Sequence, residues 1–285
     1  MAESTVAAVR VPTSGLGHEV RAASVVWQRE MIRFMKDRAR IVSSLVQPLL
    51  FLFVLGVGLS SILSAGDGSV DFTTFLFPGV LALSVLFTAA FSGISMVWDR
   101  EFGFLREMLV APVSTTAILT GKCVGGATVA TLQSLVLLAM AGLVGVPYEP
   151  VLLLALVGML FLMAFMITAL GLVLAARIKQ VQSAMPMVQL IITPLMFLSG
   201  ALFPLSGLPT WLAVVTHLNP MTYAVEPMRS VVFDHLDVDP ATRATFDPGI
   251  SWNGWPVPVT VQVALVVACC AVLLGLAVAR FARTE

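Results

Sequence analysis

The chain has 285 residues and a formal net charge of zero; 58% of its residues are hydrophobic and only 11% are charged. Soluble domains carry about 25% charged residues, and a chain of this length cannot bury so much apolar surface in a globular core. The composition excludes an ordinary soluble enzyme or nucleic-acid-binding protein, and it indicates a protein whose solvent is the lipid bilayer.

Six apolar stretches approach or exceed the length of about 20 residues that a helix needs to cross about 30 Å of hydrocarbon. They lie at 41–63, 73–97, 117–145, 151–176, 185–203 and 258–279. The fifth is short and contains Pro186 and Pro194, and Pro48 predicts local unwinding in the first. We therefore expect an all-α integral membrane protein, with six transmembrane helices in one membrane domain over 41–285.

The basic residues are sorted to one side of these spans. Of the 16 Lys and Arg residues, 13 lie before the first span, between spans 2 and 3, between spans 4 and 5, or after the sixth, and Lys122 lies near the cytoplasmic start of the third. Only Arg229 and Arg243 lie on the opposite side, among acidic residues. The positive-inside rule places the basic side in the cytoplasm, and an even number of spans puts both termini there.

The first 40 residues are polar and basic, without the apolar core of a signal peptide. We expect them to form a cytoplasmic N-terminal segment, in which 24–40 is an amphipathic helix. Its apolar face carries Trp27 and Phe34, and its basic face carries Arg29, Arg33 and Lys36. Such a helix lies in the headgroup layer of the membrane. It is either a simple topology anchor or an elbow helix that also braces a cytoplasmic partner.

A charged segment, 98–116, interrupts the apolar runs between the second and third spans. At helical spacing its apolar residues form one stripe, and the remaining positions carry charges of both signs. A connector lying on anionic lipid should be basic, whereas mixed signs suit a protein partner. We therefore predict a cytoplasmic coupling helix rather than a plain interfacial connector. Ser114 is predicted to cap the start of the next span. The residues predicted to couple are Trp98, Asp99, Arg100, Glu101, Phe102, Gly103, Leu105, Arg106 and Glu107.

Between spans 5 and 6 the chain stays on the outer side over 204–257. Its first half is too apolar for a free loop, and we expect two short re-entrant helices around a turn at Asn219-Pro220. Glu226 and Arg229 are three residues apart on the second helix and can pair, which would lower the cost of placing either charge in lipid. A role in gating is the alternative. The predicted outer-gate residues are Asn219, Pro220, Tyr223, Glu226 and Arg229.

We expect no catalytic constellation, metal site or cofactor in this chain. The stretch TGKCVGG at 120–126 lacks the order of a phosphate-binding loop and lies in a span, and the acidic stretch 234–239 lacks the glycine and distal glutamate of a calcium loop. Aromatic and methionine side chains in the spans could line a path for an apolar solute, although ordinary packing explains most of them. The candidates are Phe51, Phe53, Phe87, Phe91, Met196 and Phe197.

The run WDREFGFLREMLVAPVS resembles the signature of permease subunits of type-2 ABC exporters, and it is closest to the branch typified by daunorubicin/doxorubicin resistance permeases. In that family the connector between spans 2 and 3 contacts the ATPase subunit. The matching positions here are Arg100, Glu101, Gly103, Glu107, Leu109, Pro112 and Val113, with Ala111 in place of a Ser or Thr. The stretch HLNPMTY at 217–223 is similar to the family's Asn-Pro-x-Thr-Tyr segment.

The resemblance implies a half-transporter in the cytoplasmic membrane of a bacterium. It would pair with a second copy or a sister permease and with two ABC ATP-binding subunits, which would bind the ATP and Mg that this chain does not. The expected cargo is an amphipathic or hydrophobic compound, such as a drug, natural product or lipid, moved outward by alternating access. A lipid-linked glycan or glycolipid is an alternative cargo. An ATP-independent secondary transporter or a membrane enzyme is an alternative class. The lack of ionisable residues deep in the spans disfavours a transporter coupled to an ion gradient, and it also disfavours a strongly ionic cargo.

Overall fold

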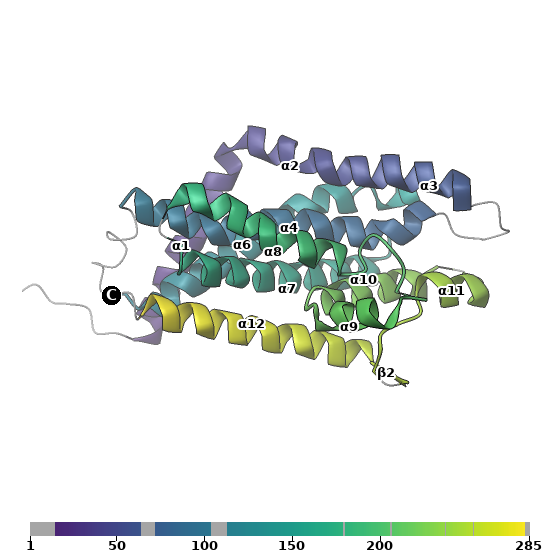
Figure 1. The fold of residues 1–285 in the computed structure, drawn as a ribbon. Coiled ribbons are helices and arrows are strands. Elements are labelled where there is room, and N and C mark those ends of the chain that lie inside the picture. Colours follow the sequence, from purple (N-terminus) through teal and green to yellow (C-terminus); the bar gives the residue numbers. More distant parts are fainter. Residues whose placement is uncertain are drawn as a thin grey trace, which may run out of the picture.

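Long apolar helices lie side by side in the computed structural model (Figure 1). It describes residues 15–63, 72–103, 113–178, 180–205, 207–236, 238–252 and 254–282. In this part of the chain, the helices long and apolar enough to cross a membrane are Arg38–Ser60, Phe72–Glu101, Thr115–Leu138, Pro150–Ala175 and Val259–Phe281. The all-α membrane fold is thereby confirmed with five candidate spans, while the sixth apolar helix, Val181–Phe197, is shorter at 17 residues.

The elements in chain order are α1 (Leu16–Lys36), α2 (Arg38–Leu50), the π-helical turn η1 (Phe51–Leu55), α3 (Gly56–Leu63), α4 (Phe72–Glu101), α6 (Thr115–Leu138), the 3-10 turn η2 (Ala141–Val144), α7 (Pro150–Ala175), α8 (Val181–Phe197), α9 (Thr210–Leu218), α10 (Thr222–Asp234), α11 (Pro240–Phe246), β1 (Ser251–Trp252), β2 (Trp255–Pro256) and α12 (Val259–Phe281). The two strands form a small antiparallel hairpin that the sequence patterns did not predict. The third and fifth spans end earlier than predicted. The chain turns beyond them at Gly145 and Gly200, whose φ angles of 77° and 72° favour glycine.

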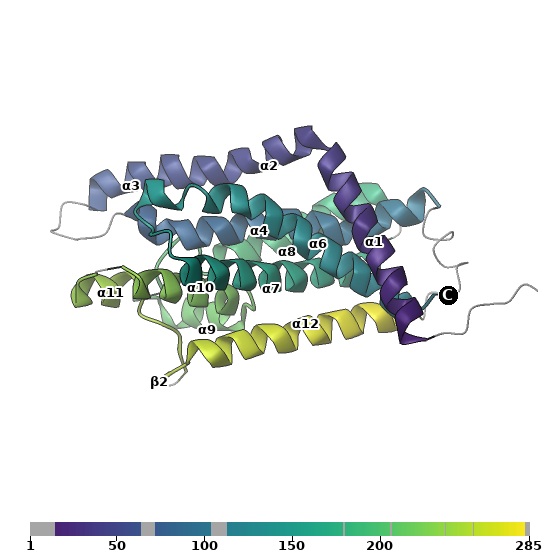
Figure 2. The same cartoon turned by 180° about the vertical axis from the view of Figure 1, so that it is seen from behind.

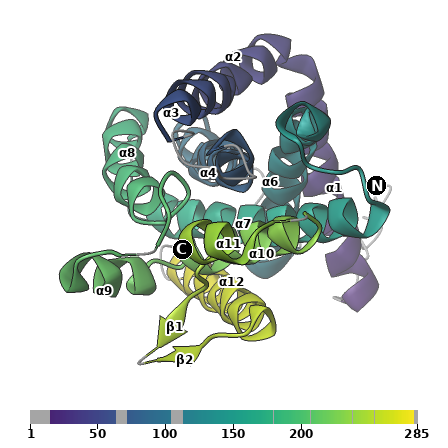
Figure 3. The ribbon, with the colours of Figure 1, turned by 90° about the vertical axis from the view of Figure 1, so that its right-hand side faces the viewer.

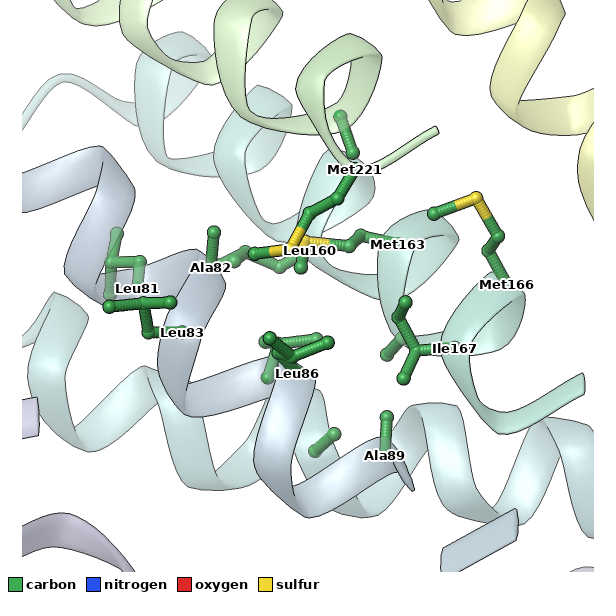
Figure 4. Close-up of a cluster of buried hydrophobic side chains, with 14 of the residues drawn as sticks. Leu81, Ala82, Leu83, Leu86, Ala89, Leu160, Met163, Met166, Ile167 and Met221 are labelled. Atoms are coloured by element: carbon green, nitrogen blue, oxygen red, sulfur yellow. The ribbon is translucent and has the colours of Figure 1, made fainter. Parts of the chain in front are cut away.

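α4 is the central helix of the bundle. Figure 3 shows it enclosed by α2 and α3, α6, α7 and α8, and 89% of its most apolar stretch is buried, against 17% for the first span. Glycines allow the closest approach, since a Cβ added at Gly171 of α7 would lie 2.9 Å from Gly93 Cα of α4. Such contacts stabilise membrane helix pairs by van der Waals packing, because lipid tails are as apolar as leucine. Figure 4 shows part of this core, where Leu86 of α4 lies beside Leu160 and Ile167 of α7.

The first span changes its winding in the middle. Pro48 lies within α2 and has no N–H to donate, and the turn that follows, Phe51–Leu55, is π-helical. π-helical turns inside α-helices are rare and often lie at functional positions. The kink or local unwinding predicted for Pro48 takes the form of this π-helical turn, whereas α8 continues as an α-helix through Pro186 and Pro194.

α1 crosses one end of the bundle, which we call the α1 end, and packs along α6 (Figure 2). The helix begins at Leu16, earlier than predicted, and its buried side is formed by Val26 and Glu30. The predicted basic face is wrong for Arg29, which turns toward the protein and bonds to Asp99 of α4. A helical wheel separates apolar from charged residues, but it cannot show that a charged residue meets a buried partner from another helix.

α9 and α10 lie at the opposite end, which we call the α10 end, and they confirm the two short helices predicted around Asn219-Pro220. α10 packs against α4, α7 and α12. Its residues from Thr222 to Arg229 are all buried, so this helix is part of the bundle and not a loose cover over it.

Candidate functional site

The last turn of α4 carries three consecutive charged residues, Asp99, Arg100 and Glu101, at the α1 end of the bundle. Each side chain bonds to a different neighbouring helix or pair of helices. The sequence predicted that these charges lie on the face of a connector helix open to a partner. In the structure they belong to the end of α4 itself, and we call these three residues the α4 hub.

Asp99 ties α4 to α1 and α6. Its carboxylate accepts a hydrogen bond of 2.8 Å from Arg29 Nη2 and bonds to the Lys122 ammonium. Lys122 is fully buried and lies 3.2 Å from the buried Glu30 carboxylate, which is 3.5 Å from Arg29. The four groups sum to zero charge, so the cluster can lie inside an apolar bundle. The open position predicted for Asp99 is therefore wrong, because the buried Lys122 requires a counterion.

Arg100 ties α4 to α7 and α12. Its Nη1 donates to the carbonyl oxygens of Ala175, at 3.1 Å, and Ile178, at 2.9 Å. The last carbonyls of a helix have no partner within the helix and favour a cation, so Arg100 satisfies the end of α7. The same guanidinium lies 5.4 Å from the ring centroid of Phe281, at the end of α12, within the range of a cation–π contact.

Glu101 ties α4 to α8. Its Oε2 accepts a hydrogen bond of 2.7 Å from the backbone N–H of Val181, the first residue of α8. The first N–H groups of a helix lack partners within the helix, and a carboxylate there is favourable to the helix dipole. The α4 hub thus connects the end of one helix to α1, α6, α7, α8 and α12.

The chain leaves α4 immediately after the hub. Phe102 is exposed, and Gly103 has a φ of 83°, a conformation that favours glycine at a helix end. Three predicted coupling residues, Leu105, Arg106 and Glu107, lie outside the described residues, so the predicted apolar stripe stays a prediction.

The chain enters α6 at Ser114, whose side chain accepts from Ala117 N at 3.1 Å, so the predicted cap is confirmed. The Glu19 carboxylate of α1 accepts from the backbone N–H of Ser114, at 3.3 Å, and from its hydroxyl. This α6 start is therefore fixed to α1, as the end of α4 is through Asp99 and Arg29.

At the α10 end, the predicted pair of Glu226 and Arg229 is confirmed at 3.2 Å. Arg229 is fully buried; its Nη2 donates to Gly200 O at 2.6 Å, and its guanidinium lies 4.3 Å from the ring centroid of Phe75. Burial raises the pKa of the Glu226 carboxyl to about 7; Arg229 opposes this rise and Asp247 adds to it. Burial also raises the pKa of Asp247. One proton retained by the two carboxyls would leave them with a single negative charge opposite Arg229.

The turn at Asn219-Pro220 joins α9 to α10 and is bonded to α8. Asn219 Nδ2 donates to Leu195 O at 2.9 Å, and its Oδ1 accepts from Met221 N at 3.0 Å. Tyr223 donates its hydroxyl to His217 O at 2.8 Å. These bonds satisfy the polar groups of a tight turn in a buried position, which gives the Asn-Pro-x-Thr-Tyr pattern a structural reason. Their predicted role in gating stays a prediction.

Two of the six candidate path residues, Phe87 and Phe91, line a cavity of about 440 Å³ near the α4 hub, together with Trp98. Phe51 and Phe53 belong to the π-helical turn of the first span. Met196 is buried and Phe197 exposed at the end of α8. The cavity unites residues of α1, α2, α4 and α8, and no pattern within one helix could have indicated that combination.

These features define a multi-pass helical membrane protein with an ion-paired hub at the α1 end and a buried ion pair in α10 at the other. Across the described residues, no group of three or more His, Cys, Asp or Glu side chains could hold a metal ion.

The family model for the ABC-2 type transporter matches residues 21–233, from α1 to α10. A transport permease named ycf38 from Cyanophora paradoxa is 28% identical over 208 residues, covering 72% of each chain. Nodulation protein J of Rhizobium leguminosarum bv. trifolii is 30% identical over 217 residues, covering 75% of this chain and 82% of the relative. The chain therefore belongs to the ABC-2 type transporter family and is its membrane permease subunit, in a family whose permeases pair with separate ABC ATPase subunits.

Proposed function

We propose that this permease moves an amphipathic or hydrophobic compound outward across the cytoplasmic membrane of a bacterium, driven by two ATPase subunits that dock at the α1 end. The observation that carries the proposal is the α4 hub. It lies at the start of the segment 98–116, in which the family resemblance places the contact with the ATPase.

The bonding of the hub supports a mechanical role. A displacement of 102–112 would pull on the last turn of α4, and that turn is bonded to α6 through Asp99, to α7 through Arg100 and to α8 through Glu101. Breaking a buried ion pair by removing one partner costs about 3–5 kcal/mol. Moving the bonded helices together avoids this cost, so the hub favours rigid-body rocking of the bundle over independent sliding of α4.

Charge supports the assignment of the α1 end to the cytoplasm. Most of the basic residues lie in the segments that meet at this end, including α1 and the end of α12. The positive-inside rule places such an end in the cytoplasm, which is where ATP-binding subunits would dock.

A second permease, either another copy or a sister chain, would complete the transporter. Apolar side chains exposed along the first span support this, among them Val42, Val46, Leu50 and Val54. A face of this kind fits either lipid or a second membrane subunit.

For the cargo, we propose only its chemical class. A drug or natural product fits the resemblance to the daunorubicin branch, and a lipid, glycolipid or lipid-linked glycan fits the same amphipathic description. Membership of the ABC-2 family argues against the ATP-independent transporter and the membrane enzyme as alternative classes.

The test is co-purification of the ATPase from the native membrane. We expect an ABC ATPase to accompany the wild-type permease and to be lost when Arg106 and Glu107 are both replaced by alanine. Glu101→Gln should retain the ATPase, because Glu101 bonds within the permease. The exposed Arg38 provides a matched control through Arg38→Gln. Full ATPase recovery with the Arg106/Glu107 variant would refute the docking assignment.

A further inference from the structure

The 440 Å³ cavity at the α1 end has a basic mouth and an aromatic wall. α4 supplies several of its lining residues, and α2 and α8 lie on different sides of α4 (Figure 3). Arg33 of α1 and Arg40 of α2 line the cavity, as do the aromatic rings of Phe87, Phe91 and Trp98 of α4. Its volume is that of a site for a small molecule or a headgroup.

One face of the first span supplies polar groups to this cavity. Arg40, Ser43 and Gln47 follow one another at spacings of three and four residues, which places them on the same side of α2. From Arg40 to Gln47 this stripe extends over about 10 Å of helix. A polar stripe in a membrane span is costly unless it faces protein or a ligand.

Thr88 gives an independent sign of a missing partner. Its side chain is only 4% exposed, it lines the cavity, and its Oγ1 has no hydrogen-bond partner among the described residues. The spans of the same protein show the usual arrangement: Thr128, Thr131 and Thr168 each donate to the carbonyl four residues earlier, at 2.7 to 2.8 Å. A buried hydroxyl without a partner is unfavourable, and a ligand in the cavity would satisfy it.

The two arginines at the mouth keep their charge available. Neither Arg33 nor Arg40 forms an ion pair with a carboxylate among the described residues. Two carboxylates lie nearby: Glu30 pairs with Lys122, and Asp37, which accepts from the backbone N–H of Arg40 at the start of α2, retains its negative charge. Arg33 and Arg40 are the charged residues among the described residues that line the cavity itself, so its lining is positive.

We propose that this cavity binds the phosphate headgroup of an anionic amphiphile, with Arg33 and Arg40 on the phosphate and the aromatic wall against the adjoining part of the molecule. Guanidinium groups bind phosphate through paired charge-assisted hydrogen bonds, and Thr88 and Gln47 provide hydrogen bonds deeper in the site. The inference rests on the proposed function, since it identifies the cargo class of that transporter.

Binding to the purified full-length permease in dodecyl maltoside tests the proposal without ATPase or ATP. The probes are hexadecyl phosphate, the neutral hexadecanol and inorganic phosphate. We expect hexadecyl phosphate to bind at least about tenfold more tightly than hexadecanol, a difference of about 1.4 kcal/mol. The double variant Arg33→Gln/Arg40→Gln should abolish this preference, and Thr88→Val should weaken hexadecyl phosphate binding severalfold. Lys36→Gln, on the same helix but outside the cavity, should bind as the wild type does.

Three results would overturn the proposal. Equal affinity for hexadecyl phosphate and hexadecanol would remove the role of the headgroup. A preference for hexadecyl phosphate that persists in the double variant would place the anion elsewhere. A preference that is lost equally in Lys36→Gln would show that it arises from general surface charge. Inorganic phosphate that binds as tightly as hexadecyl phosphate would indicate a free-anion site. Thermal melting of each variant verifies that it is folded.

The two proposals fail separately. A permease that recruits no ATPase yet selects hexadecyl phosphate would refute the proposed function, while the proposed headgroup site would stand. A permease that recruits the ATPase and lacks headgroup selectivity would refute only the site.

Discussion

Replacing Asp99 with asparagine removes one of the two carboxylates that hold the buried Lys122 ammonium. Glu30, at 3.2 Å, would then be shared between Lys122 and Arg29, so the cluster gains one net positive charge. Breaking a buried pair in this way costs about 3–5 kcal/mol. With a shift of about 2 °C per kcal/mol for a chain of this size, we expect Asp99→Asn to lower the melting temperature in detergent by about 6–10 °C.

A double substitution tests whether Asp99 and Lys122 stabilise the fold as a pair. Asp99→Asn combined with Lys122→Met removes both charges, and replacing a buried pair by neutral groups is often close to neutral for stability. The double variant should therefore melt above Asp99→Asn alone, and the exposed control Lys36→Met should melt as the wild type does. Differential scanning fluorimetry measures the wild type, Asp99→Asn, Lys122→Met, the double variant and the control. A double variant whose loss equals the sum of the two single losses would refute the coupling of Asp99 and Lys122.

Three further predictions concern the buried carboxyls at the α10 end, the packing of α4 against α7, and the start of α6. The pKa values of Glu226 and Asp247 are raised in the folded state, so the folded state binds more protons than the unfolded state. The melting temperature should therefore fall as the pH rises from about 4.5 to about 7, and Glu226→Gln should reduce this pH dependence. An alanine Cβ at Gly93 would clash with a backbone carbonyl of α7, so Gly93→Ala should destabilise the bundle by about 1–3 kcal/mol, whereas Gly158→Ala, with no neighbour within 4 Å, should be tolerated in the same melting assay. Ser114→Ala removes a helix cap worth about 0.5–2 kcal/mol and the bond to α1, so limited proteolysis should cut near the start of α6 faster than in the wild type; equal cleavage rates would contradict the anchor.

The sequence predicted what depends on local spacing and average hydropathy. The spans, the turn at Asn219-Pro220, the Ser114 cap and the pair of Glu226 and Arg229 all follow from residues within a few positions of one another. Five of the six predicted spans, the turn, the cap and the ion pair are present in the structure, while the fifth predicted span is the shorter helix α8. The helices of two predicted spans end before the turns at Gly145 and Gly200, because hydropathy does not report where the backbone leaves the helix.

The sequence could not predict contacts between helices. Arg29, Asp99 and Lys122 are 70 and 23 positions apart, and only the crossing of α1 over α6 and α4 brings them together. A helical wheel therefore placed Asp99 on an open face. For the same reason, Arg33 on the basic face of α1 could not be connected with Thr88 in the second span, although both line one cavity.

The central claim is that the α4 hub transmits the motion of the ATPase to the helix bundle. The most direct measurement is the number of cargo molecules transported per ATP hydrolysed in proteoliposomes containing the complete transporter, for the wild type and for Arg100→Gln/Glu101→Gln. We predict that the variant retains its ATPase subunits and hydrolyses ATP while this ratio falls severalfold. An unchanged ratio at equal ATPase occupancy would contradict the claim.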